Sequence, residues 1–166
     1  MGEHTERAVA ARVPTLIDKK LSVVSRREPL TVGPGATLRE CLAIIQRSGV
    51  GDSVIVTDPD GRLRGVLTER DIFGGLIGTG VDLDQPVEAY MTAQPRTLRL
   101  DQTVRDAIEL MQTGRFRNIP IVDGEGVLVG IVRQADVLRL LAEAFPEELL
   151  NLPPRPHLAA KESEGA

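Results

Sequence analysis

Two aspartates, Asp71 and Asp136, are the residues of this sequence best placed to do chemistry. Each lies six residues after a glycine, in the matching stretches 65–71 and 130–136. In both stretches an apolar pair after the glycine predicts the end of a strand, and the aspartate falls in the first turn of a predicted helix. Unpaired backbone amides collect at such a junction, so a carboxylate there has hydrogen-bond donors close by.

Both aspartates belong to a tandem repeat with an offset of 65 to 66 residues. Two lead-in segments, residues 21–25 and 87–91, occupy equivalent positions, and each is followed four residues later by a proline, Pro29 or Pro95. Such an extended match indicates duplication of a whole folding unit.

Each repeat is predicted to contain an extended segment, a helix, two strands and a second helix. The first helices open with the capping pairs Thr37 and Glu40, and Thr103 and Asp106. Strands are predicted at residues 54–56, 63–67, 119–122 and 127–132. We therefore expect an α+β fold with an N-terminal arm or helix at 1–20, a first repeat at 21–80, a second repeat at 81–142, and a short helix with a flexible tail at 143–166.

The composition of the 166 residues excludes several classes of protein. A net charge of −4 and only four aromatic residues argue against binding to nucleic acid, which requires a basic surface. The single cysteine, Cys41, lies on an apolar helical stripe, so we assign it to the core and predict neither a disulfide nor a metal site. No apolar run reaches the roughly 18 residues of a membrane span, and we expect a cytoplasmic protein.

The repeat resembles the cystathionine-β-synthase (CBS) domain over residues 21–141. The most specific elements are residues 65–71 and 111–123. The resemblance implies two β-α-β-β-α repeats packed sheet to sheet about a pseudo-twofold axis, an arrangement called a Bateman module. It also implies a cleft for an adenosine-containing ligand such as AMP, ADP, ATP or S-adenosylmethionine, a homodimer, and regulation of an unknown protein partner.

The resemblance assigns the ribose hydroxyls to Asp71 with Thr68, and to Asp136 in the second repeat. Arg133 stands where the second repeat should carry a hydroxyl. A carboxylate accepts from two vicinal hydroxyls at once, and charge-assisted bonds of this kind are about twice as strong as neutral ones. The chemistry of the aspartates thus agrees with the implied role.

Apolar strand edges offer a slot for the base, and arginines offer positive charge for phosphates. The base-pocket candidates are Thr31, Val54, Ile55, Thr97, Ile119 and Pro120. The phosphate candidates are Arg70, Arg115, Arg117 and Arg133.

Two alternatives stay open at this point. Thr68 and Asp71 form a capping box whether or not a ligand binds. The pair of repeats is also compatible with a ligand-free dimerisation or interaction scaffold, which the departures from the family pattern at Val54 and Arg133 favour. No nucleophile with a nearby base, no metal-ligand spacing and no phosphate-binding glycine loop is found in the sequence. We therefore expect a regulatory module without catalytic residues or a catalytic cofactor.

Overall fold

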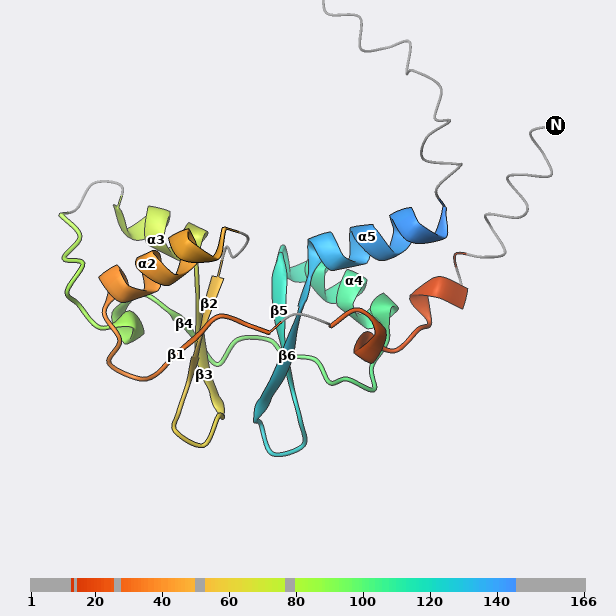
Figure 1. Cartoon of the computed structure of the whole chain (residues 1–166), viewed down its shortest axis with the longest axis horizontal. Helices are drawn as coiled ribbons and strands as arrows, with labels where there is room; N and C mark the ends of the chain where they lie inside the picture. Colours follow the sequence, from red (N-terminus) through yellow and green to blue (C-terminus); the bar gives the residue numbers. More distant parts are fainter. Residues whose placement is uncertain (1–12, 14, 26–27, 50–52, 77–79, 146–166) are drawn as a thin grey trace, which may run out of the picture.

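A computed structural model describes residues 13, 15–25, 28–49, 53–76 and 80–145. Most of the predicted arm (1–12 and 14) and of the predicted C-terminal helix and tail (146–166) lies outside these residues. The strands of both repeats lie at the centre, with each repeat's helices on its outer side (Figure 1). In chain order the elements are η1 (Leu21–Val23), β1 (Thr31–Val32), α2 (Leu38–Ser48), β2 (Ser53–Thr57), β3 (Leu63–Thr68), α3 (Glu69–Leu76), η2 (Val87–Ala89), β4 (Thr92–Ala93), α4 (Val104–Gly114), β5 (Asn118–Val122), β6 (Leu128–Arg133) and α5 (Gln134–Ala144).

The sheet of the first repeat has the order β1-β2-β3-β4. β1 runs parallel to β2, whereas β2 with β3 and β3 with β4 are antiparallel. The second repeat pairs β5 with β6 in the same antiparallel way. In place of β1 it has a parallel bridge between Leu98 and Ile121, where the Val122 amide donates to the Leu98 carbonyl at 2.9 Å. The predicted order of elements along each repeat, with an extended segment, a helix, two strands and a second helix, is confirmed.

The capping pairs predicted for the first helix of each repeat are also confirmed. In α2 the Glu40 amide donates to Thr37 Oγ1 at 3.2 Å, and the Thr37 amide donates to Glu40 Oε2 at 2.8 Å. Thr103 and Asp106 form the same reciprocal pair at α4. These bonds satisfy amides that have no partner within the helix, and so fix where each helix begins.

The two repeats pack through their sheets about an internal twofold axis. Ile55 and Val66 of the first repeat form a shared core with Ile131 of the second. At the ends of the hairpins, the Leu63 amide donates to the Gly126 carbonyl at 3.0 Å, and the Leu128 amide donates to the Gly61 carbonyl at 2.9 Å. Each bond is the twofold equivalent of the other, which confirms the predicted sheet-to-sheet arrangement.

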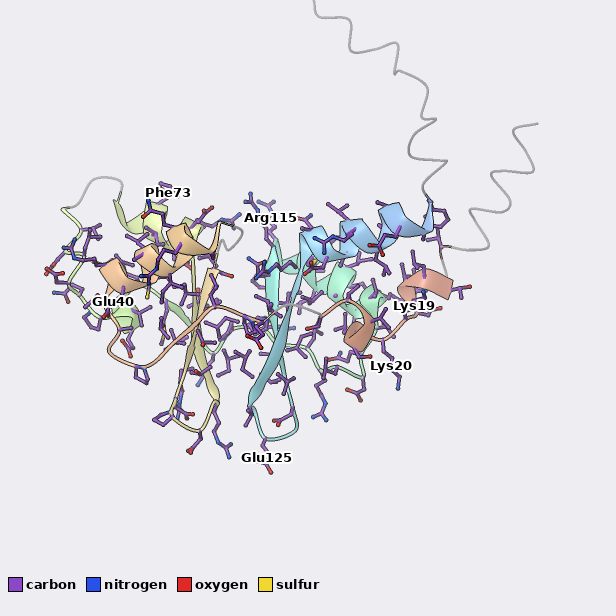
Figure 2. The ribbon with its side chains drawn as sticks, viewed as in Figure 1. Lys19, Lys20, Glu40, Phe73, Arg115 and Glu125 are labelled. Atoms are coloured by element: carbon purple, nitrogen blue, oxygen red, sulfur yellow. The ribbon has the colours of Figure 1, made fainter. Side chains whose placement is uncertain are left out.

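The lead-in segments are exchanged between the repeats. Leu21, in the first lead-in segment, is fully buried in the core of the second repeat, and Val87, in the second, is fully buried in the core of the first. The exchange is reciprocal in hydrogen bonding, since the Leu21 amide donates to the Gln102 carbonyl and the Val87 amide to the Ala36 carbonyl, both at 2.8 Å. Burial of an aliphatic side chain of this size contributes about 1.5–3 kcal/mol. Figure 2 shows Lys19 and Lys20, just before η1, beside the helices of the second repeat.

The glycine that opens each matching stretch faces the exchanged segment. Gly65 lies under the side chain of Met91, which occupies the place that a Cβ atom would take. Gly130 faces Ser25 in the same way, and Ser25 Oγ donates to the Ile131 carbonyl at 3.1 Å. A glycine at both positions therefore permits close approach of the neighbouring segment.

Cys41 is fully buried on the inner face of α2, as predicted for a core residue. Burial raises the pKa of its thiol to about 11. Because the thiolate is the reactive form, this side chain is chemically inert at neutral pH. In the part of the chain that the structure describes, no helix combines the length and the apolar character needed to cross a bilayer.

We expect Gly65→Ala to lower the free energy of unfolding by about 1–3 kcal/mol, because the added methyl group overpacks the contact with Met91. Met91→Ala opens this space, so the double variant should lose less stability than the sum of the two single variants. Urea denaturation measures all three. Gly124→Ala is the control, since a Cβ there meets only the tip of Arg99, at 3.5 Å. Additive effects of Gly65→Ala and Met91→Ala would contradict the contact.

A candidate functional site between the repeats

A cavity of about 480 Å³ lies between the two repeats. Its walls come from the end of β3 and the start of α3 (66, 68–71 and 73), from the segment around β4 (92 and 94–96), and from the end of α4 with the start of β5 (114–118 and 120). Small-molecule sites occupy roughly 300–1,000 Å³. The cavity therefore has the size of a ligand site, and both repeats contribute to it.

Asp71 and Thr68 stand together in the wall of this cavity. The amide and Oγ1 of Thr68 donate to Asp71 Oδ2 at 2.8 and 2.7 Å, and the Asp71 amide donates to Thr68 Oγ1 at 3.3 Å. This is the capping box that the sequence predicts, at the start of α3. Both bonds to the carboxylate use Oδ2, and within the described part of the chain Oδ1 accepts none. One carboxylate oxygen thus caps the helix and the other remains available.

Four arginines line the same cavity: Arg70, Arg96, Arg115 and Arg117. Three of them were predicted phosphate candidates. Arg96 was missed, because its place in the cavity depends on the exchanged lead-in segment, which carries the chain across to the first repeat before Pro95. The cavity thus gathers four guanidinium groups and two carboxylates, those of Glu69 and Asp71, in a chain whose net charge is −4.

Two non-glycine residues of the cavity wall have left-handed backbone conformations. Gln94 has φ 49° and Arg115 has φ 53°, and no other described non-glycine residue has a positive φ. Arg115 is the C-cap of α4, whereas the equivalent C-cap of α2 is Gly49, with φ 64°. An L-residue in this conformation costs about 1–2 kcal/mol, which glycine avoids. The structure therefore concentrates backbone strain at the cavity.

Only one of the base-pocket candidates, Pro120, lines this cavity. Val54, Ile55 and Ile119 are buried in three separate cores. Thr31 is exposed and Thr97 is half-buried, and neither belongs to the wall of the cavity.

The apolar part of the wall includes two aromatic residues that the sequence analysis did not select, Phe73 and Phe116. Phe73 is 61% exposed and Phe116 is 37% exposed. Figure 2 places Phe73 on α3 of the first repeat and Arg115 on the second repeat, both on the upper side of the view. The sequence offered one signal for this surface, which is that two of only four aromatic residues in the chain lie just after the two segments that resemble a known family most closely or inside them.

Asp136 and Arg133 lie outside this cavity, at the twofold-equivalent position in the second repeat. Asp136 is buried, accepts from the Arg133 amide at 3.3 Å, and has its Oδ1 3.7 Å from Arg139 Nη1. The residues equivalent to the other walls of the cavity include 26–27 and 50–52, which are not among the described residues. Ile55 is the twofold equivalent of Pro120, and its side chain is buried in the core that the two repeats share.

The comparisons with known proteins agree with this architecture. A sequence profile of the CBS domain matches residues 21–78 and 87–143. The chain belongs to the CBS domain family. It is 34% identical over 124 residues to an uncharacterized 17.7 kDa protein of Acidianus ambivalens, covering 75% of this chain and 74% of that protein. It is also 34% identical over 130 residues to the uncharacterized protein MK0525 of Methanopyrus kandleri, covering 76% of this chain and 66% of that protein.

Solved structures share the fold of this CBS pair. A CBS-domain containing protein from Agrobacterium tumefaciens, ATU1752, aligns with a TM-score of 0.66 at 31% identity, covering 73% of this chain and 98% of that one. The CBS domain pair of protein MJ0100, solved with 5-methylthioadenosine and S-adenosylmethionine, aligns with a TM-score of 0.68 at 23% identity over 76% of this chain and 98% of that one. CBSX2, solved with AMP, aligns with a TM-score of 0.66 at 24% identity over 75% and 97%. The last two are likenesses of fold.

We expect Thr68→Ala and Thr103→Ala to lower the free energy of unfolding by a similar amount, about 1 kcal/mol each, because each removes an equivalent N-cap hydroxyl. Thr103 lies outside the cavity and serves as the matched control. Chemical denaturation of the ligand-free protein measures both changes. If only Thr103→Ala were destabilising, the Thr68 hydroxyl would have no capping role, contrary to the geometry.

Proposed function

We propose that this CBS pair is a regulatory module that binds an adenosine-containing ligand in the cavity at Asp71 and signals to a protein partner by a change in the arrangement of its repeats. The observation that carries the proposal is the Asp71 carboxylate, held in the cavity wall by the Thr68 cap with Oδ1 left available. Such a carboxylate suits the vicinal hydroxyls of a ribose, because it accepts charge-assisted hydrogen bonds from both.

The apolar part of the wall suits a nucleobase. Phe73, Phe116 and Pro120 come from both repeats and face the same space as Asp71. In this proposal the sugar binds at the start of α3 and the base lies against these side chains. The fold itself accommodates adenosine ligands, as the complexes of CBSX2 and MJ0100 illustrate for those two proteins.

A ligand in this cavity would touch three parts of the protein. The walls belong to α3 of the first repeat, to the end of α4 in the second, and to residues 92–96 that connect them. A ligand changes a conformational equilibrium only if it binds one state better than another. Contacts on both repeats provide that difference, since a change in the angle between the repeats alters the cavity.

A second candidate function, a ligand-free dimerisation scaffold, is favoured by a different observation. Phe73 on α3 and Leu138 on α5 are twofold-equivalent, and they are exposed by 61% and 59%. Large apolar side chains at equivalent exposed positions suit a symmetric contact with a second copy of the chain. A homodimer is compatible with both candidate functions, so the decisive measurement is ligand binding.

We expect AMP, ADP, ATP or S-adenosylmethionine to raise the melting temperature of the protein, since a ligand at 100 times its dissociation constant adds about 2.7 kcal/mol to stability. Asp71→Asn should weaken binding about tenfold or more, because the hydroxyls lose their charged acceptor. Differential scanning fluorimetry followed by isothermal titration calorimetry measures both effects.

Asp106→Asn is the matched control, because Asp106 caps α4 with the same bonds from Thr103 but stands outside the cavity. It should cost a similar amount of stability and leave ligand affinity unchanged. If no adenosine-containing ligand shifts the melting temperature at millimolar concentration, the sensor function is wrong and the scaffold function is favoured.

We expect the protein to be a dimer at micromolar concentration and Leu138→Asp to make it monomeric, because a charge would be buried in the proposed contact. Val129→Asp, at a 43% exposed site on β6, is the control and should leave the dimer intact. Sedimentation velocity distinguishes the two species. A monomeric wild-type protein, or equal dissociation by both variants, would contradict this contact.

A further inference from the structure

The arginines of the cavity differ from most other arginines of the described chain in having no partner. Five arginines elsewhere form ion pairs: Arg39 with Asp84, Arg64 with Asp58, Arg99 with Asp101, Arg105 with Asp18, and Arg139 with Asp136. Within the described residues, the side chains of Arg70, Arg96, Arg115 and Arg117 form neither an ion pair nor a hydrogen bond. Four guanidinium groups thus share one cavity with only two carboxylates, those of Glu69 and Asp71, and within the described residues none of the four is paired with either.

Arg115 differs from the other three arginines because its backbone has a left-handed conformation, which disfavours any residue other than glycine. The internal twofold offers a direct comparison, since the same helix end in the first repeat is closed by Gly49. The two backbones are alike, with φ 64° at Gly49 and φ 53° at Arg115. The turn is therefore one that glycine makes without strain, and nothing in the helix end requires an arginine.

The second strained residue of the cavity, Gln94, lies in the wall contributed by the segment around β4. Strained residues persist only where the surrounding structure holds them in place, and they concentrate at functional sites. Here both described examples border the same 480 Å³ space. The strain and the unpaired positive charge coincide at Arg115.

We infer that Arg115 is a specificity-determining residue that binds the phosphate groups of the ligand, and that the cavity takes adenosine phosphates in preference to adenosine or S-adenosylmethionine. This inference rests on the proposed function of the same site. A phosphate supplies the acceptor oxygens and negative charge that four unpaired guanidinium groups require, and arginine matches its geometry with paired N–H groups. S-adenosylmethionine carries a sulfonium and an ammonium group against one carboxylate, so its net positive charge is repelled by the same surroundings.

The test titrates the full chain with adenosine, AMP, ADP, ATP and S-adenosylmethionine by isothermal titration calorimetry. We expect wild-type protein to bind at least one of the phosphates roughly tenfold or more tightly than adenosine or S-adenosylmethionine, as charged hydrogen bonds allow. Arg115→Gly should bring the affinity for that nucleotide close to the affinity for adenosine. It should also raise the melting temperature of the ligand-free protein by roughly 2–4 °C, because glycine relieves the left-handed conformation.

Two further variants serve as controls. One separates the effect of the Arg115 charge from the effect of its backbone conformation, and the other separates the position of the lost charge from the change in net charge. Arg115→Gln keeps an L-residue at the strained position, so it should lose nucleotide affinity without the gain in melting temperature. Arg99→Ala removes an arginine whose ion pair lies outside the cavity, and it should leave nucleotide affinity unchanged.

Each outcome decides the inference. Equal wild-type affinities for adenosine, S-adenosylmethionine and the phosphates would overturn it and leave the proposed function standing. Wild-type affinity in Arg115→Gln, or equal losses in Arg115→Gly and Arg99→Ala, would overturn the role of Arg115. Absence of binding by all five compounds would overturn both the inference and the proposed function.

Discussion

The structure depends on the exchange of the two lead-in segments. Leu21 completes the core of the second repeat and Val87 completes that of the first, and both are fully buried. Removing either repeat would therefore leave the other with an open core, and the carbonyl of Gln102 or Ala36 would lose the amide that donates to it. The two repeats therefore complete each other's cores, although each has its own sheet and its own capped helices.

The same exchange creates the cavity. After η2 has filled the core of the first repeat, the chain adds β4 to the edge of β3 and returns toward the second repeat through residues 94–96. This segment therefore lies beside Asp71, whose helix begins where β3 ends. A contact that stabilises the fold and a wall of the cavity are thus parts of one continuous stretch. The wall of the cavity therefore lies at the junction between the repeats.

The two repeats differ from each other at the residues of the cavity and at their twofold equivalents. Thr68 is replaced by Arg133 in the second repeat, and Asp136 is buried with Arg139 close to it, whereas Asp71 keeps one oxygen available. At the end of the first helix, the first repeat has Gly49, which adopts the left-handed conformation without strain, and the second repeat has Arg115 at the equivalent position. Duplication supplied two equivalent positions, and these substitutions give them different charge and different hydrogen bonding.

The sequence by itself determined the local structure. Its periodicity, capping pairs and repeated glycine-to-aspartate spacing were sufficient for the strands, the helix starts and the placement of Asp71, because these depend on neighbours within a few residues. Only the tertiary structure decided which residues share a cavity: it brought in Arg96 and Phe116, and it buried Ile55 and Ile119 in separate cores. Contacts of this kind depend on the exchange of segments 66 residues apart and on which face of a strand meets the other repeat, and local pattern carries no information about either.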